Sequence, residues 1–467
     1  MRLGKIRNIH FVGIGGIGMS GIAEVLLNQG YRVTGSDVQS SEITEKLARM
    51  GARIAYEHRP ENVADADVLI YSSAVTPDNV EVQEAYRRKI PVIKRAEMLG
   101  ELMRLKYGIA IAGTHGKTTT TSLTGAVLTE GGLDPTMIIG GKVRSMDTNA
   151  KLGRGEFLVA EADEFDRSFL SMIPTIAVIT NIEPEHLDCY RDMEDLQQAF
   201  VTFANKVPFY GKVIACLDSP GVQEILQQFK RAVETYGFST QADLIARNPE
   251  FIREGTRFEV WYRSKKLGPV QVRLPGQHNI LNALAAIAVG LELEVPFPAM
   301  QRALENFSGI SRRFEIKAEG NGILLADDYA HHPTEVRATL QGARQSYPDR
   351  RLVAVFQPHL FTRTRDFYKD FARAFFEAEV LFVTDVYPSR EKPIEGITGQ
   401  LIADAAVAMG HKQVTYVPDK QQLPQAVLAA LQPGDLVITM GAGDIWKCAA
   451  ALKAHLESDL QPEGKKR

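Results

Sequence analysis

The chain has 467 residues, more than the roughly 250 to 300 that one hydrophobic core can organise, so we expect two or three domains. Its composition is 45% hydrophobic and 24% charged, close to the average folded protein, which excludes a disordered or fibrous chain. The net charge of -3 lacks the basic excess that nucleic-acid binding requires, so no nucleic-acid partner is expected.

Hydropathy and cysteine usage indicate the compartment. No apolar run reaches the roughly 18 residues of a membrane helix, and the first residues lead into a strand and a glycine loop rather than a signal peptide. The three cysteines, Cys189, Cys216 and Cys448, are widely spaced and form no CxxC pair, which argues against disulfides or a zinc cage. We expect a soluble cytoplasmic protein without membrane insertion.

Three series of short β-rich runs alternate with helical stretches along the chain, the pattern of parallel sheets with crossover helices. They predict an α/β fold with three domains. Residues 1–105 would form an N-terminal Rossmann-like domain and 309–467 a C-terminal Rossmann-like domain. Residues 106–308 would form a central P-loop ATPase-like domain, with a mainly parallel sheet and a small antiparallel sheet near 243–275.

A glycine-rich motif follows the first expected strand and precedes a helix. Its glycines are Gly13, Gly15, Gly16 and Gly18, and Asp37 closes the next strand about 20 residues on. Glycines let backbone amides approach a diphosphate at a helix N-terminus, and the acid suits a ribose hydroxyl. A tight turn without a ligand has the same pattern. We favour a ligand, and the motif alone leaves a dinucleotide and a UDP-sugar open.

A second glycine motif resembles a phosphate loop after the apolar run YGIAIA. It comprises Gly113, Thr114, Gly116, Lys117, Thr118 and Thr119 around His115. Only two residues separate its glycines, where the usual loop has four. Lys117 would neutralise the β- and γ-phosphates and the Thr118 hydroxyl would bind magnesium. The alternative is a glycine-capped helix start with a solvated lysine and no ligand. We favour the phosphate loop, because the strand, both glycines, the lysine and the threonines all stand where such a loop needs them.

Acidic and histidine side chains follow the next two expected strands. Glu161 ends one strand, His186 follows the next, and Glu164 competes with Glu161 for the same role. Parallel strands bring their carboxyl ends to one crevice, so these residues would complete a magnesium site beside the phosphate loop. A helix cap for the acid and a local hydrogen bond for the histidine are the alternatives.

The motif GQHNILNA carries two asparagines three residues apart. Asn279 and Asn282 share one helix face and could read an adenine edge. Spacing alone favours the simpler interpretation, in which Asn279 or His278 caps the helix.

Charged residues gather in the third segment. They are Arg313, Asp327, Asp328, His331, Arg363 and Arg365. Arginine forks suit phosphates and carboxylates, and an Asp/His strand end could orient a substrate. A solvated ion-pair network explains the same residues equally well.

Taken together, GIGGIGMSG, GTHGKTTT, EADE, GQHNILNALAA, DDYAHHPTE and FQPHLFTRTRD resemble the alanine-adding members of the Mur ligase family over nearly the whole chain. The resemblance implies ATP-dependent ligation of L-alanine to UDP-N-acetylmuramate in peptidoglycan synthesis, through an acyl phosphate. It implies Mg²⁺, with two ions, and ATP as a substrate. A monomer or weak homodimer is expected.

The resemblance also assigns residues. The UDP-sugar site would comprise the first glycine motif with Asp37, Ser72 and Ser73. The ATP site would comprise the phosphate loop with Lys117, Asn279, Asn282, Arg313 and Asp328. Magnesium would be bound by Thr118, Glu161 and His186. His331, Arg363 and Arg365 would face the amino acid and the acyl group, and His331 is the candidate base for the amine.

Two positions depart from the family pattern. Several relatives carry a carbamylated lysine about fifteen residues past the magnesium histidine, whereas this chain has no lysine there before Lys206. Leu360 stands where many relatives have an arginine.

Three other functions remain as alternatives. They are a recycling ligase that attaches a preformed peptide to the same UDP-sugar, a nicotinamide-dependent dehydrogenase and a nucleotide-gated binding protein that ligates nothing.

Overall fold

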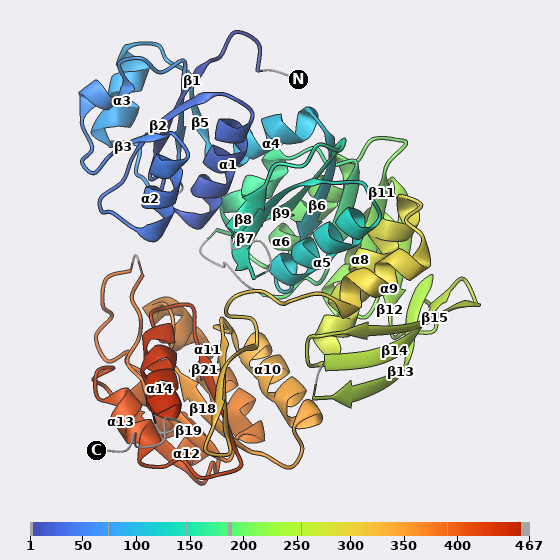
Figure 1. The fold of residues 1–467 in the computed structure, drawn as a ribbon, viewed down its shortest axis with the longest axis vertical. Helices are drawn as coiled ribbons and strands as arrows, with labels where there is room; N and C mark the ends of the chain where they lie inside the picture. The colour runs from blue at the N-terminus through green and yellow to red at the C-terminus, as the bar shows by residue number, and fades with distance from the viewer. Residues whose placement is uncertain are drawn as a thin grey trace, which may run out of the picture. The chain divides into compact units, whose positions relative to one another are not determined.

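The computed structural model describes residues 3–72, 74–144, 148–184, 189–253, 255–389 and 391–458. Three β-sheets follow one another along the chain, each with helices packed against it (Figure 1). The chain forms two compact units, of which one comprises 1–248, 259–270 and 281–308 and the other comprises 249–258, 271–280 and 309–467. Among the helices described, none is long and apolar enough to cross a membrane.

The N-terminal sheet has five parallel strands in the order β3-β2-β1-β4-β5. The strands are β1 (Asn8–Val12), β2 (Arg32–Ser36), β3 (Arg53–Ala55), β4 (Val68–Tyr71) and β5 (Val92–Lys94). The helices are α1 (Ile17–Asn28), η1 (Pro60–Val63, a 3-10 helix), α2 (Glu42–Arg49), α3 (Val80–Arg87) and α4 (Arg95–Arg104). Val12 pairs with Ser36 on one side and Tyr71 on the other, so the carboxyl ends of the three inner strands meet at one edge.

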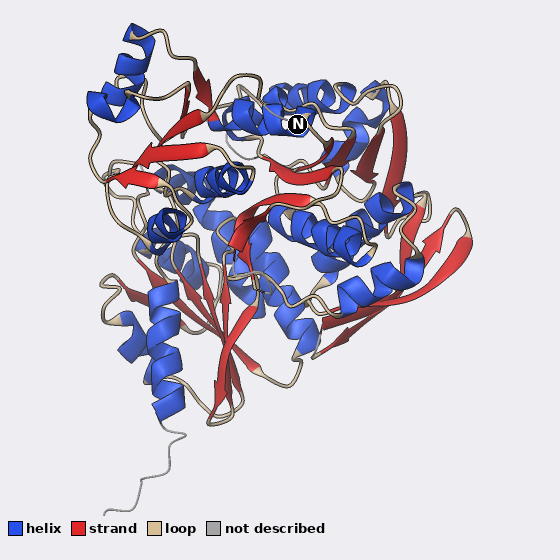
Figure 2. Cartoon of the chain, turned by 45° about the horizontal axis from the view of Figure 1, so that its top comes forward, coloured by secondary structure: helices blue, strands red, loops and turns tan. Residues whose placement is uncertain are grey.

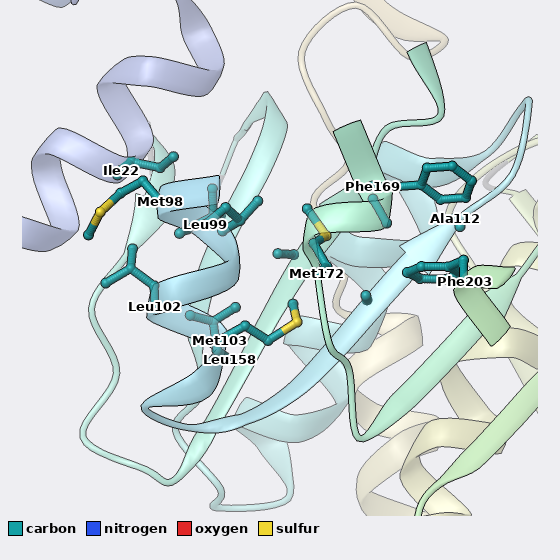
Figure 3. Close-up of a cluster of buried hydrophobic side chains, with 14 of the residues drawn as sticks. Ile22, Met98, Leu99, Leu102, Met103, Ala112, Leu158, Phe169, Met172 and Phe203 are labelled. Carbon is teal, nitrogen blue, oxygen red and sulfur yellow. The ribbon is translucent and has the colours of Figure 1, made fainter. Parts of the chain in front are cut away.

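Helix α4 joins the N-terminal sheet to the central one through a shared core. Figure 3 shows Met98 of α4 beside Ile22 of α1, with Leu99 farther along α4. Leu99 is fully buried, and burial of such a side chain stabilises the fold by about 1.5 to 3 kcal/mol. A Cβ at Gly100 would lie 2.5 Å from the carbonyl oxygen of Ser171, so glycine lets the two segments approach closely.

The central sheet has ten strands in the order β15-β14-β13-β12-β11-β10-β6-β9-β7-β8. The strands are β6 (Tyr107–Ala112), β7 (Thr136–Val143), β8 (Thr148–Lys151), β9 (Phe157–Ala162), β10 (Ile176–Ile179), β11 (Lys212–Cys216), β12 (Ala232–Gly237), β13 (Leu244–Ile252), β14 (Gly255–Tyr262) and β15 (Lys265–Val272). The helices are α5 (Lys117–Glu130), η2 (Phe165–Ser171), α6 (Met193–Asn205), α7 (Pro220–Ile225), η3 (Leu226–Gln228), α8 (Gln277–Glu292) and α9 (Phe297–Glu305).

The predicted small antiparallel sheet is a continuation of the parallel one. β13 pairs in parallel with β12 through Tyr236 and Leu244. Two-residue connections then lead to β14 and β15, and such short connections join only antiparallel neighbours. The central segment therefore holds one mixed sheet where two sheets were expected.

The C-terminal sheet has the order β16-β17-β21-β18-β19-β20, with β16 antiparallel and the others parallel. The strands are β16 (Glu315–Gly320), β17 (Ile323–Asp328), β18 (Arg351–Phe356), β19 (Val380–Thr384), β20 (Val414–Val417) and β21 (Asp435–Met440). The helices are α10 (Pro333–Ser346), α11 (Phe361–Ala374), η4 (Phe375–Glu377), α12 (Gln400–Ala408), α13 (Leu423–Leu428) and α14 (Trp446–Ser458).

Both faces of this C-terminal sheet are buried, as its continuous apolar strands predict. Leu436 and Ile438 of β21 pack with residues of α10, α11 and α12, whereas Val437 between them packs with Leu452 of α14. Figure 2 shows helices on both sides of these strands. Because helices cover both faces, polar side chains of this sheet are expected at the carboxyl ends of its strands.

Candidate active site

The first glycine motif forms the turn between β1 and α1. The amides of Gly13 and Ile14 both donate to the carbonyl oxygen of Ser36, at 2.9 and 3.1 Å. Gly13 has a φ of +79°, which glycine adopts without strain. Gly16 caps α1 without a side-chain bond, so the amides of the first helical turn point toward a site for an anion.

Asp37 and Ser72, two of the residues expected in the UDP-sugar site, lie against this turn. Asp37 Oδ2 accepts a hydrogen bond of 2.7 Å from the amide of Gly15, and a Cβ at Gly15 would lie 2.8 Å from the same oxygen. Ser72 Cβ would lie 3.3 Å from a Cβ at Gly13. Ser73 lies outside the described residues.

Arg95, which the sequence analysis did not single out, also reaches the turn. A Cβ at Gly18 would lie 3.1 Å from Arg95 Cδ and 3.2 Å from its Nη1. A guanidinium there adds a positive charge to the N-terminal end of α1, where a diphosphate is favoured. Its only signal in the sequence is its place directly after the fifth strand, at the start of α4.

A buried carboxylate supports the same edge of the sheet from within. Glu81 accepts hydrogen bonds of 2.5 Å from Ser36 Oγ and from Asn62 Nδ2, and His10 Nε2 lies 3.3 Å away. Burial raises the pKa of Glu81, but the hydrogen bonds from His10, Ser36 and Asn62 outweigh burial and leave it at about 2. Since Ser36 also accepts from two amides of the glycine turn, this network holds the turn in place.

The phosphate loop joins β6 to α5 and is tied to the segment after β10. The amide of Thr114 donates to the Asn181 carbonyl at 3.0 Å, and the amide of His115 donates to Asn181 Oδ1 at 2.8 Å. Thr180 Oγ1 donates to the His115 carbonyl at 2.7 Å. These two loop amides are therefore engaged within the protein, and the amides of the first turn of α5 are left to cradle phosphates.

Asn282 lies against this loop. A Cβ at Gly116, whose φ is +82°, would lie 2.5 Å from Asn282 Oδ1, and the same oxygen accepts from Thr120 Oγ1 at 3.1 Å. Asn279 instead bonds locally, because its Nδ2 donates to the Pro275 carbonyl at 2.7 Å. The two asparagines of one motif thus have different surroundings.

The two candidate acids, one within the last residues of β9 and one just after it, have different partners. Glu161 pairs in register with Ile111 of β6, and its Oε1 accepts a bond of 2.6 Å from the Gly140 amide. Glu164 Oε2 accepts a bond of 2.8 Å from Lys117 Nζ. Glu164 stands at the N-terminus of η2, where its side chain makes no cap hydrogen bond, and Glu161 lies within a strand. His186, the third expected metal ligand, lies outside the described residues.

Thr118 and Thr119 begin α5 beside Lys117, and both are largely buried. The Thr118 hydroxyl and the Glu161 carboxylate offer the oxygen ligands that Mg²⁺ prefers. The donor set on this edge of the sheet therefore fits the predicted metal.

In the C-terminal sheet, Asp328 ties two loops together at the end of β17. Its Oδ2 accepts from the Phe314 amide and its Oδ1 from the Ala330 amide, each at 2.7 Å. Burial raises the pKa of Asp328, against the opposing charge of Arg313. Arg313 lies with its guanidinium over the Tyr329 ring, 5.3 Å from the centroid.

Arg312 was missed, although it stands beside Arg313 in the sequence. Its Nε donates to Asp327 Oδ2 at 3.0 Å, and its other nitrogens donate to the carbonyls of Gly441 and Gly443. Arg312 thus fastens the start of this domain to the sheet edge, and both its guanidinium and that of Arg313 lie over the Tyr329 ring, 5.2 and 5.3 Å from the centroid.

His331 and Arg363 meet around a third residue, His359. The rings of His331 and His359 are 5.8 Å apart, and Arg363 Nη1 lies 3.3 Å from His359 Nδ1. Arg365 is directed elsewhere, because its Nε donates to Asp366 at 2.7 Å and its side chain is half-exposed. The structure brings His331 and Arg363 together and leaves Arg365 outside this group.

Three family models match most of the chain, one after another. Residues 8–107 match the Mur ligase family catalytic domain, 111–290 the Mur ligase middle domain, and 312–443 the Mur ligase glutamate ligase domain. Because these models together span most of the chain, they account for all three sheets.

Relatives are similar over nearly their full length. The chain is 54% identical to a UDP-N-acetylmuramate–L-alanine ligase of Geobacter sulfurreducens, over 98% of this chain and 99% of the relative. It is 54% identical to the same-named protein of Salinibacter ruber, over 98% of this chain and 96% of the relative.

Solved structures have the same fold. The crystal structure of a UDP-N-acetylmuramate-alanine ligase from Thermotoga maritima matches with a TM-score of 0.83 at 29% identity, over 97% of this chain and 99% of that one. A murein peptide ligase from Psychrobacter arcticus matches with a TM-score of 0.71 at 24% identity, over 96% and 98%, which concerns the fold alone. The chain therefore belongs to the Mur ligase family.

Proposed function

We propose that this protein is an ATP-dependent ligase that joins L-alanine to the lactyl carboxylate of UDP-N-acetylmuramate in peptidoglycan synthesis, releasing ADP and phosphate. The observation that carries the proposal is the 54% identity to UDP-N-acetylmuramate–L-alanine ligases over 98% of the chain. We expect the reaction to take place in the cytoplasm.

The glycine turn after β1 would hold the UDP-sugar. The first-turn amides of α1 and the Arg95 guanidinium would face the diphosphate. Asp37 keeps the turn in shape through Gly15 and, with Ser72, would contribute to the sugar-nucleotide site. A nicotinamide dehydrogenase would leave the second glycine loop and Lys117 without a purpose.

A carboxylate does not accept an amine at neutral pH, so it must first be activated. The first turn of α5 and Lys117 gather positive charge where the β- and γ-phosphates of ATP would lie, which favours attack of the carboxylate on the γ-phosphorus. The bond from γ-phosphorus to the bridging oxygen breaks, ADP leaves, and an acyl phosphate forms. Arg313 would add charge to the same phosphates.

Thr118 and Glu161, with His186, would hold Mg²⁺ in the proposed site, and the chemistry supplied there would be neutralisation of charge on the transferring phosphoryl group. Every other contact to the phosphates would come from the amides and side chains of this chain.

The amine of L-alanine then attacks the acyl carbon, and phosphate leaves with one oxygen of the original carboxylate. His331 and Arg363, gathered around His359, would face the alanine carboxylate and the reacting acyl group. His331 would accept the amine proton.

The test is an assay of ADP release with UDP-N-acetylmuramate against a panel of amino acids and the L-alanyl-γ-D-glutamyl-diaminopimelate tripeptide. We expect ADP release with L-alanine and a product whose mass increases by one alanyl residue. A preference for the tripeptide would instead support the recycling ligase. ADP release without any amide would indicate a nucleotide switch.

A further inference from the structure

The ammonium of Lys117 donates to acceptors of its own neighbourhood. Its Nζ donates to the carbonyls of Gly113 and Thr114 at 2.7 and 3.1 Å, and to Glu164 Oε2 at 2.8 Å. The Lys117 side chain is 15% exposed and that of Glu164 only 1%. The phosphate loop lysine therefore has a buried counter-ion.

A phosphate oxygen must replace at least one of these acceptors when a nucleotide binds. Losing a loop carbonyl leaves behind a neutral group, whereas losing Glu164 leaves a buried carboxylate without its ammonium, which is far more costly. Lys117 should therefore keep Glu164 and exchange a carbonyl. The carboxylate would then set where the ammonium stands throughout the reaction.

Glu164 itself is held firmly. Its carbonyl oxygen accepts bonds of 2.6 Å from Tyr190 Oη and 3.0 Å from the Arg167 amide. Tyr190 is buried, and the Arg167 guanidinium lies 4.8 Å from the centroid of its ring. A residue fixed at its backbone in this way can transmit a defined position to its side chain.

The two acids of the EADE motif differ in a way that bears on the metal. An oxygen 2.8 Å from an ammonium is poorly placed to bind a second cation, because the two positive charges repel. The Glu161 carboxylate accepts a bond from the neutral Gly140 amide, an arrangement typical of carboxylates that bind metals.

We infer that Glu164 is a positioning residue that fixes Lys117 for phosphoryl transfer, while Glu161 keeps the metal-ligand role already proposed for it. The assignment rests on the proposed function, since it concerns ATP used by this ligase. It predicts that Glu164 acts through Lys117 and that Glu161 does not.

The experiment is a double-mutant cycle on ADP binding, measured by calorimetry with EDTA and again with Mg²⁺. The proteins are the wild type, Glu164→Gln, Lys117→Met and the double variant, with Glu161→Gln as the matched control. Removing the carboxylate charge near the phosphates should tighten metal-free ADP binding about threefold to tenfold in Glu164→Gln. In the Lys117→Met background the same substitution should change binding less than about twofold.

The metal arm separates the two acids. The ratio of ADP affinity with Mg²⁺ to that with EDTA should be unchanged in Glu164→Gln and should fall in Glu161→Gln. In the ligase assay, Glu164→Gln should lower kcat about 10- to 100-fold while lowering KM for ATP, because the ammonium is less well fixed. Glu164→Asp keeps the charge but shortens the reach, so it should lower kcat without tightening ADP binding.

A loss of the Mg²⁺ effect in Glu164→Gln but not in Glu161→Gln would overturn the inference, as would equal effects of Glu164→Gln with and without Lys117. If Glu164→Gln does not fold by circular dichroism, Glu164→Ala, which also removes the carboxylate charge, serves in the same cycle. ADP binding involves neither UDP-N-acetylmuramate nor alanine. If these proved not to be the substrates, the ADP-binding results would still test the role of Glu164.

Discussion

The carboxylate of Asp37, directly after β2, accepts a 2.7 Å hydrogen bond from the amide of Gly15 in the turn before α1. Asp37 Oδ1 also accepts from the amide of Val38 at 2.8 Å. The acid therefore shapes the glycine turn itself, in addition to the ligand contact expected of it. Loss of its side chain should affect the UDP-sugar and leave the nucleotide loop of the next sheet unaltered.

Asp37→Ala should raise the Kd for UDP-N-acetylmuramate about 10- to 100-fold, because a hydrogen bond to a charged acceptor contributes about 1.5 to 3 kcal/mol. ADP affinity should change less than about twofold. Calorimetric titration of both ligands measures this, with Asp37→Asn as a control that retains one acceptor. An equal loss of ADP affinity would mean that the two sites are not separate.

The buried Glu81 network predicts a dependence of stability on pH. The pKa of Glu81 is about 2 in the folded protein against an ordinary value of 4.5, so the folded state favours the charged form. The resulting stabilisation is fully present above about pH 4.5 and is lost as the pH falls toward 2. Its size is on the order of 3 kcal/mol, since one pKa unit corresponds to about 1.4 kcal/mol.

Urea unfolding of the wild type and Glu81→Gln between pH 7 and pH 3 tests this. The variant should be less stable at pH 7, and the difference in unfolding free energy should shrink as the pH falls. Other carboxylates titrate in both proteins and cancel in the difference. A difference that stays constant with pH would show that the charge of Glu81 is not what the network stabilises.

Lys206, the first lysine after the magnesium-histidine motif, follows α6 as its C-terminal cap. Its Nζ donates to the Leu170 carbonyl, and burial lowers its pKa. Because this lysine has a structural partner, we expect that it does not replace the carbamylated lysine of some relatives. Turnover in carbon-dioxide-free buffer should match turnover with added bicarbonate, and a strict bicarbonate requirement would contradict this assignment.

The two arginines of the FQPHLFTRTRD motif should not be equivalent. Arg363→Ala should lower kcat/KM for L-alanine about 100-fold or more, because Arg363 is largely buried beside His359. Arg365→Ala should have a much smaller effect, since this arginine is half-exposed and paired with Asp366. Steady-state kinetics with varied L-alanine measures kcat/KM for the two variants. Equal losses of kcat/KM would mean that Arg365 also belongs to the alanine site.

The parts of the site that the sequence predicted well are those set by short segments. Strand, glycine turn and helix follow one another within about ten residues at Gly13 and again at Gly113, so local pattern suffices to place them. The three α/β segments followed from the same alternation of strands and helices.

The parts that were not predicted depend on contacts between distant residues. Asn282 lies against Gly116, more than 160 residues earlier in the chain. No spacing rule distinguishes Glu161 from Glu164, because their roles depend on whether Gly140 or Lys117 is the partner. In the third segment the sequence marked Arg313 and Arg365 but not Arg312 or His359. The partners of these side chains are set by contacts made only in the folded chain, such as Asp327 for Arg312 and Arg363 for His359.

The most direct test of the proposed ligase is to follow the carboxylate oxygen of UDP-N-acetylmuramate. With ¹⁸O in that carboxylate, ATP, Mg²⁺ and L-alanine, mass spectrometry should find UDP-N-acetylmuramoyl-L-alanine, ADP and phosphate carrying one ¹⁸O, because the oxygen leaves with the γ-phosphoryl group. AMP that carries the ¹⁸O, released with pyrophosphate, would contradict the account even if the alanine amide formed, because the carboxylate would then have been activated at the α-phosphate.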